Sequence, residues 1–123
     1  MKSEIIWQRI EGALIFLIGI WVYNSLGGAL PWWLLLPAFL APDLSLAAYA
    51  AGPKVGGFVY NLFHIYGFGL IVLVFGSVTG QSILLELGAL WFAHAGFDRM
   101  LGLGLKTAEG IRFTHLGTGG ARR

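Results

Sequence analysis

The sequence contains no cysteine and few charged residues. Lys, Arg, Asp and Glu make up 11% of the 123 residues, whereas soluble domains carry about 25%. Without cysteine, the chain has neither disulfides nor thiolate metal sites. The formal net charge is only +2, and no basic stripe interleaves with aromatic residues, so we expect no nucleic-acid partner. This composition indicates an integral membrane protein rather than a soluble domain.

Several catalytic motifs are also absent. The chain has no HExxH metalloprotease motif, P-loop, nucleophile elbow or dinucleotide-binding fingerprint. The glycine-rich segment at residues 102–106 follows a predicted helix rather than a strand, so it is not a phosphate cradle of a known type. Any site must therefore be assembled from side chains that are far apart in the sequence.

Hydrophobic residues are abundant: they make up 57% of the chain. Four apolar stretches are each long enough to cross about 30 Å of hydrocarbon at 1.5 Å per residue. They cover residues 5–26, 30–51, 55–78 and 82–103. Since lipid cannot satisfy backbone polar groups, we predict an all-α integral membrane bundle of four antiparallel transmembrane helices. Pro42 predicts that the second helix is broken.

The basic residues predict the orientation. The connections at residues 24–30 and 77–82 carry no Lys or Arg, whereas Lys54 and both ends of the chain are basic. The positive-inside rule then places both termini in the cytoplasm. We expect a multi-pass protein of the bacterial inner membrane, with a transmembrane domain over residues 1–104 and a polar cytoplasmic tail over residues 105–123.

Acids and histidines recur at one predicted depth in all four helices. Their estimated heights differ by only about 6 Å at 1.5 Å per residue. A charged group that faces lipid costs roughly 2.5–3.5 kcal/mol, so we expect these side chains to turn inward and meet in the cytoplasmic half of the bilayer. The residues of this polar layer are Glu11, Asp43, His64, His94 and Asp98.

Local spacing supports a shared pocket. His94 and Asp98 are four residues apart on one helix face, and Asn61 lies three residues before His64 on another. Carboxylates and histidines without a thiol form the ligand set of zinc, manganese or iron. The Asp and His side chains could bind such a divalent metal, and Glu11 could act as general base toward a bound water.

Three further residues have simpler interpretations. Arg99 is expected to extend toward lipid phosphate, although it could also support the pocket. Glu86 lies near the outer end of the fourth stretch and is expected at the membrane interface. His115 belongs to the tail and is expected at the surface, unless the tail folds back over the pocket.

Several motifs resemble an uncharacterised family of small bacterial four-helix membrane proteins, catalogued only as a domain of unknown function. They are APDLS at residues 41–45, YNLFH at 60–64, HAGFDR at 94–99 and FTHLG at 113–117, together with Glu11. The resemblance spans nearly the whole chain. It implies the fold and no activity.

A weaker resemblance is to the membrane-bound metal-dependent hydrolases, which carry PD-x-D, histidine-rich and H-x-x-x-D segments in a similar order. It implies four metal ligands: Asp43, His64, His94 and Asp98. Two departures limit the site, because Ser45 replaces the second acid and His64 stands alone where that family has a histidine pair. The chain can therefore hold one metal, or two with Glu11 and His115.

Three hypotheses follow. The protein could be a metal-dependent hydrolase that acts on a lipid or phosphoester from the cytoplasmic side. It could instead be a non-enzymatic metal-binding or ligand-binding protein or a transport component, for which four helices would require a homodimer. The third hypothesis is a structural bundle whose polar layer fixes the helix register.

Overall fold

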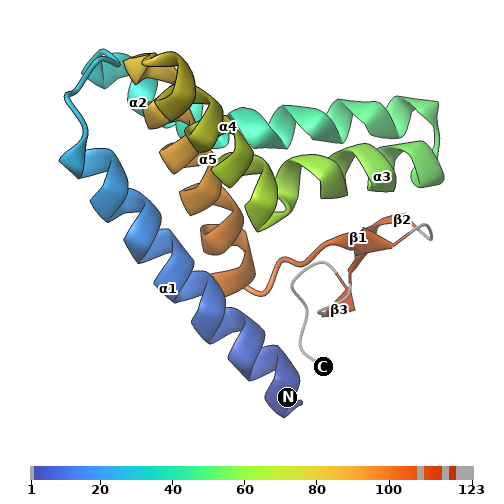
Figure 1. Ribbon diagram of the computed structural model, residues 1–123. Coiled ribbons are helices and arrows are strands. Elements are labelled where there is room, and N and C mark those ends of the chain that lie inside the picture. Colours follow the sequence, from blue (N-terminus) through green and yellow to red (C-terminus); the bar gives the residue numbers. More distant parts are fainter. Residues whose placement is uncertain (1, 108–109, 115–116, 119–123) are drawn as a thin grey trace.

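The computed structural model describes residues 2–107, 110–114 and 117–118. Its helices follow the four predicted apolar stretches (Figure 1). They are α1 (Ser3–Ser25), then η1 (Trp32–Leu34), α2 (Leu35–Leu40) and η2 (Ala41–Ala51), then α3 (Pro53–His64) and α4 (Tyr66–Thr79), and finally α5 (Ser82–Met100). The α-helix α2 gives way to the 3-10 helix η2 at Ala41, which agrees with the predicted break near Pro42.

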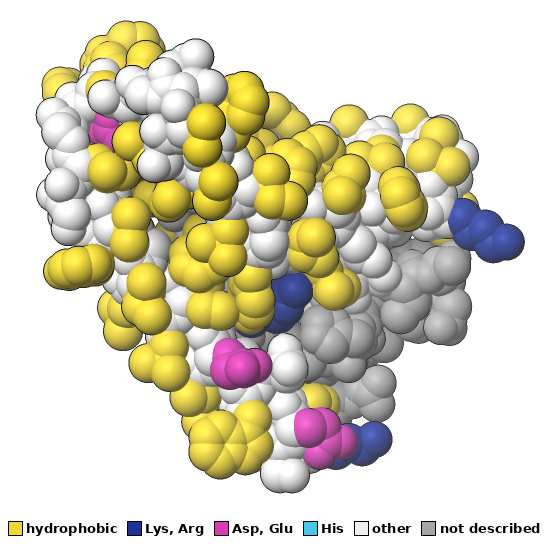
Figure 2. Space-filling model, viewed as in Figure 1, with side chains coloured by type: hydrophobic (Ala, Val, Ile, Leu, Met, Phe, Trp, Pro, Cys, Tyr) yellow, Lys and Arg dark blue, Asp and Glu magenta, His cyan; other side chains and the backbone are white. Residues whose placement is uncertain are grey.

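Some of these stretches are long and apolar enough to cross a membrane. Ser3–Ser25 and Trp32–Ala51 each qualify alone, and α3 with α4 qualifies if the bent pair counts as one span. Much of the visible surface is hydrophobic, with few charged side chains (Figure 2). The residues described thus support a membrane protein with two or three spans, whereas four antiparallel spans are not confirmed.

The helix α5 is the centre of the bundle. Glycines on its two neighbours allow close backbone approach. A Cβ on Gly12 of α1 would lie 2.6 Å from the carbonyl oxygen of Gly96, and a Cβ on Gly69 of α4 would lie 2.5 Å from the backbone nitrogen of Phe92. Contacts this close bury most of the second half of α5. A helix enclosed in this way can carry charged residues that a lipid-facing helix cannot.

The predicted third span is not straight, because α3 and α4 are bent by 51° relative to each other. Ile65 between them has an extended backbone. Side chains of α5 bind carbonyl groups freed at the break: Trp91 Nε1 donates to Phe63 at 2.8 Å, and Arg99 Nη2 donates to His64 at 3.4 Å. The break is therefore stabilised by tertiary contacts, without a proline.

The bend changes the direction of the chain. In Figure 1, α3 and η2 lie side by side and project away from the body formed by α1, α4 and α5. After α5, three short strands form an antiparallel sheet in the order β1-β2-β3. The strands are β1 (Lys106–Thr107), β2 (Gly110–Thr114) and β3 (Gly117–Thr118). This arrangement places the ends of α3 and α5 and the start of η2 around one point.

Candidate metal centre

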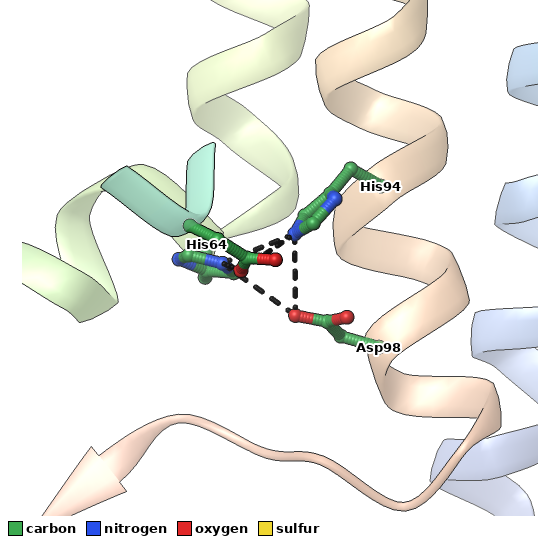
Figure 3. Close-up of side chains that lie close together, drawn as sticks. His64, His94 and Asp98 are labelled. Atoms are coloured by element: carbon green, nitrogen blue, oxygen red, sulfur yellow. Dashed lines mark hydrogen bonds and ion pairs between the residues drawn. The ribbon is translucent and has the colours of Figure 1, made fainter. Parts of the chain in front are cut away.

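Four acids and histidines meet at this point. Asp43 comes from η2, His64 from the last turn of α3, and His94 and Asp98 from successive turns of α5. Each offers one ligand atom, and the four atoms all lie within 4.8 Å of one another. Figure 3 shows the labelled His64, His94 and Asp98 pointing toward one another. Of the polar layer predicted from the sequence, only Glu11 is missing from this group.

The separations between the four ligand atoms match a tetrahedral metal site. Metal–ligand bonds of about 2.0–2.2 Å in a tetrahedron separate the ligand atoms by about 3.3–3.6 Å. Asp43 Oδ1 lies 3.2 Å from Nε2 of both histidines, and the two Nε2 atoms lie 3.2 Å apart. Asp98 Oδ2 lies 3.5 Å from His64 Nε2 and 3.4 Å from His94 Nε2. Five of the six separations are therefore close to those of ligands around one small ion, and all four atoms lie within 4.8 Å of one another.

The protonation of His64 also suits metal binding. Its Nδ1 lies 2.8 Å from the carbonyl oxygen of Tyr60. A carbonyl oxygen only accepts hydrogen bonds, so Nδ1 carries a proton and the neutral ring leaves a lone pair on Nε2. The Tyr60 ring stacks on the His64 ring with a centroid separation of 3.7 Å. His64 is thus held with its free nitrogen toward the centre, as second-shell contacts hold metal-binding histidines.

His94 faces a conflict that a cation would resolve. Its Nδ1 is buried and has no hydrogen-bond partner among the described residues. If the ring proton is on Nδ1, the two Nε2 lone pairs face each other at 3.2 Å. If it is on Nε2, that nitrogen can donate to a carboxylate of Asp43 or Asp98, and in either arrangement Nδ1 is without a partner among the described residues. A metal ion between the two Nε2 atoms removes the repulsion in the first arrangement.

The centre is closed on most sides. His64, His94 and Asp98 are 0%, 1% and 6% exposed, and the Tyr60 hydroxyl donates to Asp98 Oδ2 at 3.4 Å. Asp43 is different, because its side chain is 41% exposed. Any exchange of metal, water or ligand therefore has its most direct route past Asp43.

The tail is fixed beside this centre by Asn61. Its amide accepts a hydrogen bond from the backbone N–H of Lys106 at 2.6 Å and donates to the Lys106 carbonyl at 2.8 Å. The Lys106 ammonium lies 4.7 Å from the centroid of the Tyr60 ring. Partial burial lowers the pKa of Lys106, while the carboxylates of Asp98 and Asp43 oppose that shift. Asn61 thus fixes the backbone of Lys106 beside the centre, and its support of the pocket stays a prediction.

Two sequence-based interpretations are wrong. Arg99 does not extend to the surface: it is 4% exposed, and its guanidinium carbon lies 5.1 Å from the centroid of the Tyr66 ring. Glu86 is not interfacial either, because it is 0% exposed and accepts the backbone N–H groups of Ala29 and Leu30 at 2.6 and 3.4 Å. Both charges are buried because partners from distant parts of the chain surround them.

Two predicted site residues are not among the four ligands. Glu11 is exposed on α1 and is outside the group of four, so its role as general base stays a prediction. His115 lies outside the described residues. Each position is separated in the sequence from the helices that supply the four ligand atoms.

A family model described as a domain of unknown function (DUF4260) matches residues 5–118. The chain belongs to this family. The match confirms the resemblance to an uncharacterised family. No curated protein and no solved structure matches the chain. What the DUF4260 chain does must therefore be inferred from its own site.

Two groups near the centre of this DUF4260 chain, Tyr60 and Lys106, are not among the site residues predicted from the sequence. Tyr60 was embedded in a motif but carried no charge that would mark it, and Lys106 followed the last predicted helix. The spacing Tyr60, Asn61 and His64 does place all three on adjoining faces of one helical turn. That spacing could have indicated Tyr60 as a neighbour of His64, whereas the return of Lys106 to α3 is a tertiary contact.

Proposed function

We propose that this DUF4260 protein is a membrane protein with a mononuclear divalent-metal centre. Its ligands are Asp43, His64, His94 and Asp98, and zinc fits the tetrahedral Asp₂His₂ set best, with manganese or iron as alternatives. The observation that carries the proposal is the convergence of four ligand atoms within 4.8 Å, with each histidine nitrogen 3.2–3.5 Å from the other three atoms. The metal would join η2, α3 and α5, which belong to distant parts of the sequence.

Charge supports the same proposal. With neutral imidazoles, the four ligand side chains have a combined charge of −2, which a divalent ion bound among them balances directly; Arg99 and Lys106 lie close enough to act on Asp98 but offer no ligand atom. Close carboxylates in a low-dielectric environment are costly without such compensation. A polar layer that only fixes helix register would need donors for its acceptors, whereas these four residues direct mainly acceptor atoms at one another.

Elemental analysis of detergent-purified full-length protein tests the proposal. After metal exchange and desalting, the wild type should retain about one divalent ion per chain, and His94→Ala should retain almost none. Glu86→Gln serves as a control because it changes a buried acid on the same helix without touching the four ligands. Wild-type protein that retains no ion would favour the register-fixing bundle.

Metal-dependent hydrolysis of a lipid or phosphoester is a second candidate. Two observations favour it: Asp43 is 41% exposed, and an apolar cavity of about 370 Å³ lies beside η2. Pro42 and Leu44, which flank Asp43 in the sequence, line that cavity, and its size suits part of an acyl chain. Hydrolysis would require the metal to accept a water as a fifth ligand, or in place of the partly exposed Asp43, and that water would supply the nucleophile. Metal-loaded protein that turns over no member of a phosphoester and lipid-ester panel would favour a non-enzymatic binding or transport component.

We also infer that the protein lies in the bacterial inner membrane with both termini in the cytoplasm. The asymmetric distribution of Lys and Arg supports this orientation. A C-terminal reporter that is active only in the periplasm should remain silent, and a cytoplasmic reporter at the same position should be active. The reverse result would place the metal centre on the other side of the membrane.

A further inference from the structure

Arg99 is a buried cation with unused hydrogen-bonding capacity. It is 4% exposed, its Nη2 donates to the His64 carbonyl at 3.4 Å, and its Nη1 has no partner among the described residues. A buried N–H group without an acceptor costs about 1–3 kcal/mol, and more on a charged group. The described residues of α3, α4 and α5 around the guanidinium supply no acceptor for Nη1.

A second unused donor lies beside it. The hydroxyl of Tyr66 is buried and also has no partner among the described residues. The Arg99 guanidinium carbon lies 5.1 Å from the centroid of the Tyr66 ring, so both groups belong to one small region. The Glu11 carboxylate acts electrostatically on Tyr66 and is exposed on α1. Two neighbouring buried donors without acceptors indicate a site for an oxygen-rich ligand.

Lys106 is a second cation close to Asp98, the metal ligand that precedes Arg99 in the sequence. Its ammonium lies 4.7 Å from the centroid of the Tyr60 ring, and the Tyr60 hydroxyl donates to Asp98. Arg99 follows Asp98 directly on α5, and the Asp98 carboxylate acts electrostatically on both cations. Asp98 is therefore flanked by one positive charge from its own helix and one from β1.

Without a metal, the charges of Arg99 and Lys106 balance the carboxylates of Asp43 and Asp98. A divalent ion with the two carboxylates is neutral, which leaves the charges of Arg99 and Lys106 uncompensated in the metal-loaded protein. Arg99 is buried and Lys106 partly buried, and a buried charge without a partner is strongly destabilising in a low dielectric. A ligand with a charge near −2 would restore neutrality. A phosphate monoester has this charge, and its oxygens match the fork of an arginine.

We propose that Arg99, Tyr66 and Lys106 form an anion-binding subsite beside the metal centre, and that this subsite takes the phosphate group of the ligand. The proposal rests on the metal centre proposed above and names the class of ligand that the centre receives. The phosphate can belong to a free ion or to the headgroup of a phospholipid, and the two sources are separated experimentally.

The test measures binding of inorganic phosphate to the full-length, zinc-loaded protein in detergent by calorimetry. Arg99→Lys and Lys106→Gln should each weaken binding by about tenfold or more, because each removes a charge-assisted hydrogen bond. Two matched controls remove a positive charge elsewhere. Arg9→Gln changes a residue of α1 whose side chain donates to the Met100 carbonyl at the end of α5, and Lys54→Gln changes an exposed residue. These controls should bind phosphate as the wild type does.

A second arm uses nanodiscs of phosphatidylcholine with and without phosphatidic acid. If the phosphate comes from a headgroup, phosphatidic acid should compete with inorganic phosphate, and Lys106→Gln should weaken that competition by a similar factor. If only free phosphate binds, phosphatidic acid will not compete, and the subsite stands with a soluble ligand.

Clear results would overturn the subsite. Equal phosphate affinities in wild type, Arg99→Lys and Lys106→Gln would show that the zinc ion alone holds the anion. Zinc-loaded protein that binds no phosphate would end the subsite while leaving the metal centre intact. Loss of zinc from the wild type would instead refute the metal centre itself, so the two failures are distinguishable. Because Arg99→Lys keeps a positive charge at the buried position, a loss of phosphate binding in this variant is not explained by loss of that charge and unfolding of the protein.

Discussion

The helix α5 buries two carboxylates in opposite environments. Glu86 near its start is 0% exposed and accepts two backbone N–H groups from the loop that follows α1. Asp98 near its end is 6% exposed and faces two imidazole nitrogens and a second carboxylate, with the Tyr60 hydroxyl as a donor. Backbone N–H groups donate hydrogen bonds to Glu86, whereas the atoms closest to Asp98 in the group of four are imidazole nitrogens and a carboxylate oxygen that can themselves accept hydrogen bonds or bind a cation.

This difference separates a structural acid from a ligand-binding acid. A buried carboxylate that accepts backbone N–H groups is already stabilised, and it fixes the loop that provides them. A buried carboxylate among other acceptors is stabilised only when a positive ion joins the group. Burial alone would have ranked Glu86 above Asp98 as a site residue, so the identity of the neighbours is the better criterion.

The largest expected effect concerns metal content. Asp98→Asn should lower the retained divalent ion from about one per chain to near zero, because it removes an anionic ligand. Glu86→Gln, which makes the same chemical change on the same helix, should retain the wild-type content. Elemental analysis after desalting measures both. Equal metal content in the two variants would break the distinction between the two acids.

The next effect concerns stability. A metal that binds only the folded protein stabilises it by about 2.7 kcal/mol at a hundredfold excess over Kd. Zn²⁺ or Mn²⁺ should therefore raise the melting temperature of chelator-treated wild type, while His94→Ala should show no gain. Glu86→Gln should start from a lower melting temperature and still respond to the metal. A wild-type melting curve that ignores divalent ions at pH 7.5 would contradict the metal centre.

Glu86 itself should contribute to stability without metal. Glu86→Gln should lower the free energy of unfolding by about 1–3 kcal/mol, because the backbone N–H groups of Ala29 and Leu30 lose a charged acceptor. Denaturation in the presence of a chelator isolates this effect. Asp43→Asn is the comparison, and it should change stability less than Glu86→Gln when no metal is present. A larger loss in Asp43→Asn would reverse the assignment of roles.

The metal-dependent gain should also depend on pH. Histidine side chains ordinarily have a pKa near 6.5, and a protonated ring nitrogen cannot ligate a metal. The gain should therefore be largest at the highest pH and decrease as the pH falls and the imidazoles take up protons. Melting curves at each pH, with and without Zn²⁺, measure the difference. Glu86→Gln should follow the same profile, since its substitution is remote from the imidazoles.

The smallest effect is expected for Glu11. Because Glu11 is exposed and outside the group of four, Glu11→Gln should leave metal content and thermal gain almost unchanged. If Glu11 acts as a general base, the same variant should lose any hydrolysis that the wild type performs. A clear fall in metal content would instead make Glu11 a ligand.

The sequence predicted much of the helical framework from local properties. Apolar runs bounded by glycine and proline placed the four helical stretches, and Pro42 marked the change at η2. Spacing of four residues put His94 and Asp98 on one face of α5. These features depend on helix periodicity and on the cost of burying charge in lipid, both of which act on neighbouring residues.

The bend at Ile65 and the glycine contacts around α5 could not be predicted from the sequence, because they depend on contacts between residues far apart in the chain. A helix without proline breaks there because Trp91 and Arg99 supply donors to its freed carbonyls. Only that bend turns α3 so that His64 meets His94. The burial of Arg99 and Glu86 has the same origin, since their partners come from other helices and loops.

The amino-acid sequence by itself determined that this is a helix-rich membrane protein with an Asp and His ligand set, because composition and periodicity are local quantities. The tertiary structure decided which of those acids and histidines converge, since convergence depends on how helices bend and how closely they pack. It thereby brought Asp43, His64, His94 and Asp98 to within bonding reach of one ion and left Glu11 outside.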